Sequence, residues 1–269
     1  MISQKLINLL SGGQLRTLII RLALRDLESR YRGSLFGLFW VIFTPMLMVA
    51  TYAFVFTYIF QPRWVVEEGV DANFVLLLYS GILIHGAFSD VVGRAPGLIL
   101  ENVSYVKKVV FPLNILPMVT LVSALINLLI GTAILVAIYT VMYGLPPLTA
   151  VMLPVTFLPT LLYALGIAWL LSALGVYLRD LRHVVAVIIS MLMFLSPIFY
   201  PIETLPAALQ PILKASPLTP SLEASKDVLF WGVLPDPLFF GGSTVLSLLV
   251  CVAGFVAFNR LRRGFADVV

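Results

Sequence analysis

The feature that most constrains this chain is a stretch of 70 residues, from Val109 to Leu178, that contains no Asp, Glu, Lys, Arg or His. One crossing of a bilayer needs only about 20 apolar residues, so the stretch is long enough for two. Gly144-Leu145-Pro146-Pro147 interrupts it near the middle, and proline disfavours helix because it lacks a backbone N–H. We expect two membrane-spanning helices here, over residues 113–143 and 149–178, joined by a tight turn.

Four further apolar segments have the same character. Residues 33–60 carry no charge, and as a helix they would be about 40 Å long, more than the ~30 Å of the hydrocarbon core. The other three cover residues 72–93, 184–202 and 237–259. Because 61% of the residues are hydrophobic and only 11% are charged, with a mean hydropathy of +1.05, the chain lies outside the range of soluble domains. We predict an all-α, polytopic membrane protein in which residues 1–269 form one transmembrane domain of six helices.

The segment before the first span is amphipathic. At 3.6 residues per turn, one side of a helix over residues 14–31 is charged and the other is apolar. The charged side holds Arg21, Arg25, Glu28 and Arg32, and the apolar side holds Leu15, Ile19, Leu22, Ala23 and Leu27. This pattern predicts a helix that lies on a surface and leads directly into the first span.

Lysine and arginine are distributed unevenly between the two sides that six spans define. Fourteen of them lie on the side of the two termini: before residue 33, between 94 and 108, between 179 and 182, and after 259. Only Arg63, Lys214 and Lys226 lie on the opposite side. Positive residues collect in cytoplasmic loops, so we expect both termini in the cytoplasm. Membrane topology thus explains the net charge of +4, and we expect no nucleic-acid partner.

The segment 201–236 is too polar to span, and seven of the 17 prolines lie between residues 201 and 238. We expect two short helices in it, over residues 206–214 and 220–230. Thr219 is the expected N-cap of the second helix, with Pro220 at its first position.

Several kinds of active site find no support in the sequence. None of the five lysines follows a glycine directly, so the phosphate-binding motif GxxxxGK[ST] is missing. The two histidines, His85 and His183, lie on different segments and do not form a zinc motif. We expect no catalytic residue, metal or cofactor on this chain.

Three ionisable residues near the second span allow two interpretations. Asp90 and Arg94 are four residues apart, which places them on one helix face as an ion pair. Alternatively, His85 and Asp90 form a proton relay, because ionisable groups at membrane depth are costly and often functional. The relay would belong to a membrane-embedded enzyme or a proton-coupled transporter; the ion pair is the simpler interpretation.

Aromatic residues recur at steps of three or four along the first span. The stripe consists of Phe36, Trp40, Phe43, Leu47, Ala50, Phe54 and Tyr58. Lipid contact or core packing would explain any single member. The functional interpretation is a pathway of flat faces on which sugar rings stack, which suits a moving polymer.

Four segments, taken together and in order, resemble a known family. They are RDLESRYRGSLFGLFWVIFTPMLMVATYAFVFTYIF, NVSYVKKVVFPLNILPM, YLRDLRHVVAVIISMLMFLSPIFYPIETLP and the closing RRGFADVV. Over essentially the whole chain they are similar to the type-2 ABC exporter permeases for bacterial surface polysaccharides, of the O-antigen and teichoic-acid kind. Capsule exporters of the group-2 kind share the architecture and match less closely.

The resemblance implies a homodimer of permeases in the bacterial inner membrane. Two copies of a separate ATPase subunit would bind to it and carry the ATP and Mg²⁺. The substrate would be a polyprenyl-pyrophosphate-linked polysaccharide that leaves the cytoplasm. A permease for drugs or lipids, from the same superfamily, is the alternative.

The resemblance also implies roles for particular segments. The helix over residues 14–31 would be an interface helix that rests on the ATPase and the membrane surface, and residues 201–236 would form re-entrant gate helices on the outer side. The expected ATPase-coupling residues are Asn102, Tyr105, Lys107, Lys108 and Phe111. Spans one and five would line the channel, so that Phe194 and Tyr200 join Phe36, Trp40, Phe43, Phe54 and Tyr58. The expected gate residues are Pro206, Pro211, Pro220 and Trp231. The arginines Arg25, Arg30 and Arg32 would either guide the pyrophosphate or act only as positive anchors at the membrane surface.

Overall fold

The computed structural model describes residues 12–31, 33–34, 36–55, 74–103 and 111–265. Every regular element in these ranges is a helix, as the apolar segments predict. In chain order the elements are α2 (Gly12–Tyr31), η1 (Gly37–Phe39), α3 (Trp40–Phe54), α4 (Phe74–Arg94), η3 (Ala95–Gly97), η4 (Leu100–Asn102), η5 (Leu113–Ile115), α6 (Leu116–Tyr143), η6 (Leu148–Met152), α7 (Leu153–Thr156), α8 (Leu158–Tyr177), α9 (Leu181–Phe194), η7 (Ile202–Thr204), α10 (Gln210–Lys214), α11 (Thr219–Lys226), η8 (Asp227–Trp231), α12 (Pro237–Leu261) and η9 (Arg262–Gly264).

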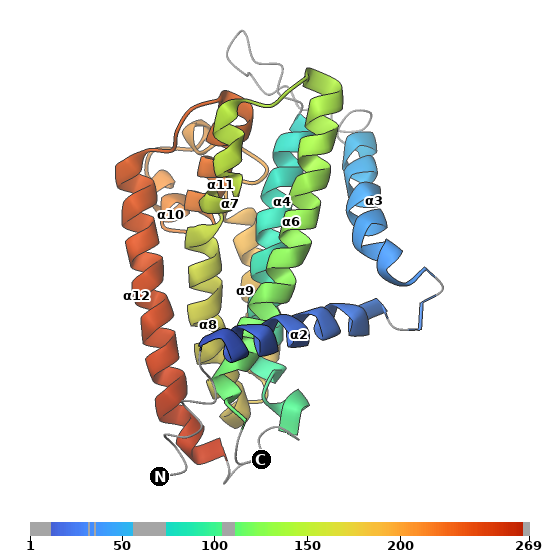
Figure 1. The fold of residues 1–269 in the computed structure, drawn as a ribbon. Coiled ribbons are helices and arrows are strands. Elements are labelled where there is room, and N and C mark those ends of the chain that lie inside the picture. The colour runs from blue at the N-terminus through green and yellow to red at the C-terminus, as the bar shows by residue number, and fades with distance from the viewer. Residues whose placement is uncertain (1–11, 32, 35, 56–73, 104–110, 266–269) are drawn as a thin grey trace.

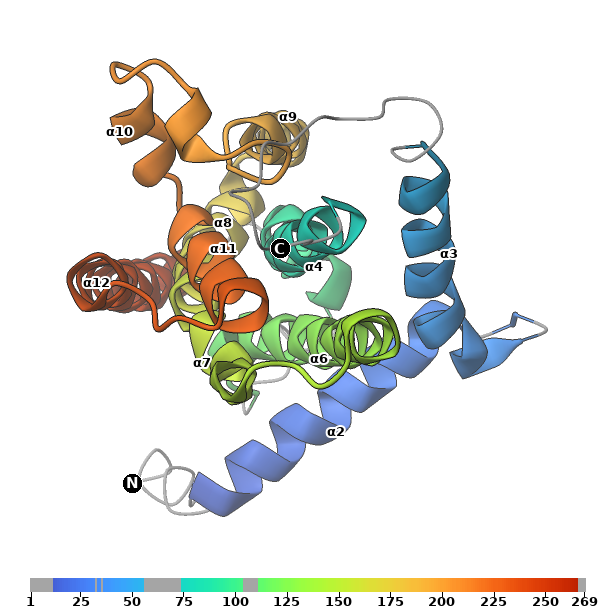
Figure 2. The same cartoon turned by 90° about the horizontal axis from the view of Figure 1, so that it is seen from above.

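The long helices form a bundle with a common axis, and α2 lies crosswise near one end of it (Figure 1). Seen along that axis, α4 is central, while α12 and α3 lie at opposite outer edges (Figure 2). Among the described residues, four helical segments are long and apolar enough to cross a membrane: Phe74–Gly97, Leu113–Tyr143, Leu148–Tyr177 and Pro237–Gly264. They correspond to four of the six predicted spans.

The central position of α4 follows from its sequence, which is apolar on nearly every face. Tyr79, Phe88 and Val91 are each at most 1% exposed. The helix packs against α6, α8, α9 and α11. In contrast, Val245 and Leu249 on α12 point outward. Exposed apolar side chains are expected on a helix that borders lipid, because lipid tails are equally apolar.

The contact between α8 and α12 depends on glycine. A Cβ atom on Gly254 would lie 2.0 Å from the carbonyl oxygen of Gly166, and one on Gly166 would lie 2.5 Å from the carbonyl oxygen of Val250. Small residues of this kind let membrane helices approach until their backbones touch. Trp169 and Phe255 close the same interface edge to face, with ring centroids 5.0 Å apart.

The predicted turn between the third and fourth spans is confirmed. α6 ends at Tyr143, and Gly144 follows with a φ of +86°, a left-handed value that side chains with a Cβ rarely adopt. The N–H of Gly144 donates to the carbonyl oxygen of Thr140 at 3.0 Å. η6 then begins the return path after Pro147.

Two predicted spans contain shorter helices. α3 covers 15 residues with Pro45 inside it, and residues 56–60 of the predicted span lie outside the described ranges. α9 covers 14 residues and ends at Phe194, so only the first part of the predicted span over residues 184–202 is α-helical. The reason is Pro197, which lacks an N–H and disfavours helical geometry at the residue before it.

The proline-rich segment forms short helices at the end of the bundle opposite α2 (Figure 1). α10 begins at Gln210 rather than 206, and α11 ends at Lys226 and continues as the π-helix η8. Thr219 is the first helical residue and not the predicted N-cap, which is Leu218. The Thr219 hydroxyl instead donates to the carbonyl oxygen of Leu213 at 2.6 Å, because the tight turn after α10 brings that oxygen within reach.

Candidate functional site

The crosswise helix α2 is fastened to the bundle through its apolar side. Ile19 and Ala23 are buried against Ile115 and Val119 at the start of α6, and Leu27 is buried on the same side of the helix. The Ser123 hydroxyl donates to the carbonyl oxygen of Ala23 at 3.1 Å. The side of α2 that the sequence predicts to be apolar is therefore the side that packs against the protein.

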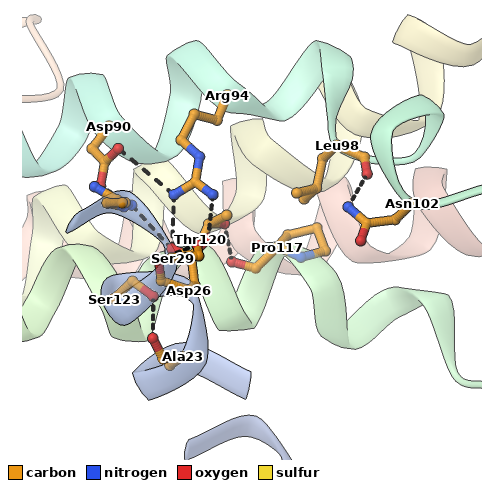
Figure 3. Close-up of polar contacts among 11 residues, drawn as sticks. Ala23, Asp26, Ser29, Asp90, Arg94, Leu98, Asn102, Pro117, Thr120 and Ser123 are labelled. Atoms are coloured by element: carbon orange, nitrogen blue, oxygen red, sulfur yellow. Dashed lines mark hydrogen bonds and ion pairs between the residues drawn. The ribbon is translucent and has the colours of Figure 1, made fainter. Parts of the chain in front are cut away.

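A cluster of four charged residues joins α2 to α4, and we call it the α2–α4 charge cluster (Figure 3). Arg94 donates to the two carboxylate oxygens of Asp26 at 2.6 and 3.0 Å. Arg30 lies 3.1 Å from Asp26 and 2.8 Å from Asp90. Because the charges are partly buried and alternate in sign, the cluster holds α2 in one position on α4.

Asp26 is the central carboxylate of this cluster. Burial acts to raise its pKa, but the hydrogen bond and charge of Arg94, the charge of Arg30 and the Ser123 hydroxyl outweigh burial. The pKa of Asp26 therefore lies below its ordinary value, and the carboxylate stays ionised at neutral pH.

The predicted ion pair between Asp90 and Arg94 exists but is not the main one. Their closest atoms are 3.8 Å apart, whereas Arg94 reaches Asp26 at 2.6 Å. The sequence-based prediction missed Asp26, although one signal was available: Asp26 lies on the apolar side of the helix, beside Ala23 and Leu27. The Nε2–H of His85 donates to the carbonyl oxygen of Ile189 on α9 at 3.2 Å, while Asp90 pairs with the arginines.

The three arginines that were expected near the pyrophosphate occupy different surroundings. Arg30 belongs to the α2–α4 charge cluster. Arg25 is exposed and lines a cavity of about 260 Å³ between α2, the end of α4 and the start of α6. Arg32 lies outside the described residues.

The expected ATPase-coupling residues are only partly described. Asn102 donates to the carbonyl oxygen of Leu98 at 2.9 Å and lines the same 260 Å³ cavity as Arg25. Phe111 packs at the edge of the apolar clusters beneath α2 and beside α8. Tyr105, Lys107 and Lys108 lie outside the described residues. Next to Asn102, Glu101 pairs with Arg182 at 3.2 Å, a contact between distant segments that sequence spacing does not reveal.

The aromatic stripe of α3 points away from the core. Phe36 and Phe54 are 63% and 58% exposed, and the rings of Trp40 and Phe43 meet edge to face at 5.5 Å. Tyr58 lies outside the described residues. The stripe is thus available for lipid, a second protein copy or a polymer.

The structure does not bring the α9 aromatics against this stripe within one chain. Figure 2 shows α3 and α9 on different sides of α4. Phe194 is 65% exposed and stacks on Phe199 with ring centroids 5.7 Å apart. The Tyr200 hydroxyl donates to the carbonyl oxygen of Phe194.

Of the expected gate residues, only Pro220 lines a small charged cavity near the start of α12. Pro206 and Pro211 are exposed around α10, Trp231 is 38% exposed at the end of η8, and Pro220 is buried. A cavity of about 290 Å³ beside Pro220 is lined by acidic and basic residues, namely Glu203, Lys214, Glu223, Asp227 and Asp236.

Two charged residues of the gate segment have unusual surroundings. Burial and the neighbouring Glu223 raise the pKa of Asp227 to about 6, against the opposing effect of Lys226. The buried Lys226 donates to the carbonyl oxygen of Pro197 at 2.8 Å and to Glu223 at 3.0 Å. In the described ranges, no three His, Cys, Asp or Glu side chains gather as a metal site would require.

Comparison with known proteins gives one family match and several relatives of full length. A family profile described as "ABC-2 type transporter" matches residues 17–230. An O-antigen export system permease protein RfbA from Myxococcus xanthus is 27% identical, over 95% of this chain and 96% of the relative. One of the same name from Klebsiella pneumoniae is 23% identical, over 96% of both chains. A polysialic acid transport protein KpsM from Escherichia coli is 20% identical, over 88% of this chain and 91% of its own.

Proposed function

The chain belongs to the ABC-2 type transporter family, and from that premise we propose that it is the permease subunit of an ATP-driven polysaccharide exporter. The observation that carries the proposal is the match, over nearly the whole length of both chains, to permeases named for O-antigen export. The more distant relative is named for transport of polysialic acid, which is also a sugar polymer. A polysaccharide is therefore a better candidate substrate than a drug or a lipid.

The proposed substrate is a finished polysaccharide linked to polyprenyl pyrophosphate, which is moved out of the cytoplasm across the bacterial inner membrane. In this arrangement α3 and α9 cross the bilayer together with the four longer helical segments. Both termini lie in the cytoplasm, on the side of the bundle where α2 and the end of α12 carry most of the arginines. The short helices α10 and α11 then lie on the outer side, as the gate.

The proposed assembly is a homodimer with two copies of a partner ATPase, which binds ATP and Mg²⁺. Two copies are needed because one chain holds the α3 stripe and Phe194 on different sides of α4. In a dimer, the exposed aromatic faces of α3 and α9 can border one pathway. Flat rings offer a sliding sugar chain contact area without deep pockets.

Coupling is proposed to run through α2 and the segment from Asn102 to Phe111. When ATP brings the two ATPase copies together, a force on α2 is passed to α4 through the α2–α4 charge cluster. The permease then shifts between two states that differ in affinity for the glycan, since only a differential affinity can drive transport. Arg25, which is exposed and lines the 260 Å³ cavity beside α2, is the proposed guide for the anionic pyrophosphate.

The experiment that tests this function is depletion of the chain in its native cell. Lipid-linked glycans are then extracted and compared with those of cells in which a second copy of the gene restores the protein. We expect a long polyprenyl-pyrophosphate glycan to accumulate and the surface polymer to disappear. An unchanged glycan pool would refute polysaccharide export and favour the drug or lipid permease.

A further inference from the structure

A cavity of about 560 Å³ lies between α3, α4 and α6, on the inner side of α3. This volume is in the range of small-molecule sites in proteins. The cavity reaches from Asp90 to Tyr79 on α4, which at 1.5 Å per residue is roughly 16 Å. It is therefore elongated along the bundle axis and lies within the length of the membrane-spanning part of α4.

The lining is mainly apolar and also contains several polar side chains. Pro45, Met48 and Met193 contribute apolar surface. The uncharged polar residues and the histidine of the lining are Thr44, Tyr52, Tyr79, His85, Ser89 and Asn127. Polar side chains at membrane depth are costly unless they face water, a partner or a ligand.

Two polar atoms of this lining have no partner. In the part of the chain that the structure describes, the hydroxyl of Tyr79 and the amide oxygen of Asn127 are buried and form no hydrogen bond. Tyr79 as a whole is only 1% exposed. A buried polar atom without a partner costs about 1–3 kcal/mol, so a ligand group or an ordered water that met these two atoms would stabilise the protein.

The charges of the lining argue for a neutral ligand. Arg30 and Asp90, at the end of the cavity near α2, are paired with each other at 2.8 Å. They leave no unpaired charge that would select an ion. A hydrocarbon chain would fill the apolar part but would leave Tyr79 and Asn127 without partners, whereas a hydroxyl group can accept from one and donate to the other.

We propose that this cavity binds a neutral, hydroxyl-bearing sugar unit, with Tyr79 and Asn127 as hydrogen-bonding residues and Met48 and Pro45 against the apolar face of the ring. The proposal rests on the proposed function, because it places the sugar of the same exporter inside the subunit. The site is separate from the aromatic stripe: at 100° per residue, Thr44, Met48 and Tyr52 lie on average about 115° around α3 from the stripe.

The first test is the double variant Tyr79→Phe/Asn127→Leu in the complete complex. Removing two polar atoms that have no protein partner leaves the fold as stable as before or more stable. We expect glycan export to fall about tenfold or more, as for the loss of a ligand hydrogen bond, while the thermal midpoint of the purified complex does not fall. The matched control is Tyr163→Phe/Asn259→Leu, in which neither residue lines the cavity; we expect its export to stay at the wild-type level.

Two results of this experiment would overturn the proposal. Wild-type export in the double variant would mean that ordered water alone meets Tyr79 and Asn127. A thermal midpoint that falls together with export would mean that the two residues are structural. Neither result bears on the proposed function, which is read independently from the glycan pool after depletion.

The second test identifies the occupant directly. A photoreactive amino acid replaces Met48 in cells that make their native glycan, and adducts are analysed by mass spectrometry after irradiation. We expect sugar-bearing adducts at position 48 and none at the control position Val245, which is exposed on α12. Adducts with lipid chains only, or no adducts at position 48, would contradict a sugar site.

Discussion

The pair α8 and α12 and the pair α3 and α4 pack in opposite ways. Gly166 and Gly254 let the first two helices approach until a single Cβ atom would collide with backbone. The second two touch each other and, together with α6, border a 560 Å³ cavity whose wall is mainly apolar with several polar side chains. Two backbones that touch at glycines have no side chains that could change rotamer, so their contact has one arrangement. Side chains around a cavity can rearrange.

This difference indicates which half of the molecule is fixed and which half moves. We infer that the α8–α12 pair is the frame, and that α3, together with α2, which salt bridges hold on α4, is the part that a partner can displace. Regions with low packing density and few buried apolar contacts open at lower free energy than close-packed ones. The following predictions are in order of decreasing effect, and the first three test this division.

The largest effect is expected for Gly254→Ala, which places a methyl group against the Gly166 carbonyl oxygen. Overpacking typically costs 1–3 kcal/mol, and a clash with backbone belongs at the upper end, about 3 kcal/mol. Thermal unfolding of the purified protein measures it. Gly242→Ala on the same helix is the control, since a Cβ there meets nothing within 4 Å and alanine favours helix. If Gly254→Ala unfolds at the wild-type temperature, the α8–α12 pair is not the rigid half.

A smaller, local effect is expected for Asp26→Asn, which removes the carboxylate at the centre of the α2–α4 charge cluster. Arg94 then loses its closest partner, at a cost of about 1–3 kcal/mol. Hydrogen exchange should speed up in α2 and not in α8 or α12. Glu28→Gln is the control, because Glu28 is exposed on the opposite side of the same helix. Uniformly faster exchange throughout the bundle would show that α2 is not a separable unit.

The same carboxylate predicts a pH dependence for α2. A lowered folded-state pKa means that the stabilising effect of Asp26 is complete above its unfolded value of 3.8. It is lost as the pH falls through the lowered folded-state value, so wild-type α2 should lose exchange protection only in strong acid. In Asp26→Asn this acid step should be missing.

The smallest effect is expected for Asp227→Asn at the gate. Because the folded-state pKa of Asp227 is raised to about 6, its contribution to stability is complete below 3.8 and is lost as the pH rises through about 6. The wild-type thermal midpoint should therefore fall slightly between about pH 4 and pH 6 through this group, and Asp227→Asn should remove that slope. The control is Asp180→Asn at an exposed site before α9. An unchanged slope in Asp227→Asn would assign the pH dependence to other groups.

Local patterns predicted the parts of the fold that depend on neighbouring residues in the chain. The charge-free stretch and Gly144 predicted α6, the turn and the return path, because helix length and a left-handed turn are set locally. The spacing of Ile19, Ala23 and Leu27 predicted the buried side of α2. Pro197 lay inside a predicted span and ended the helix, which shows that apolar composition alone does not make a helix continuous.

Contacts between distant segments could not be predicted in the same way. Spacing proposed Asp90 as the partner of Arg94, but the closer partner is Asp26, which only the crosswise placement of α2 brings near. No sequence signal marks the Tyr79 and Asn127 atoms that lack a partner among the described residues, since both residues lie in ordinary apolar helices. The resemblance to polysaccharide permeases predicted the function, whereas the cavity on the inner side of α3 is seen only in the structure.

The glycine contact of α8 with α12 also has a consequence for how the protein is made. Gly166 is synthesised long before Gly254. The surface of α8 around Gly166 therefore stays uncovered while the gate segment and the last helix are still being made. Insertion of the final helix is therefore the step that completes the frame. A chain that stops before α12 should remain a target for membrane quality control, however well its first five apolar segments have been inserted.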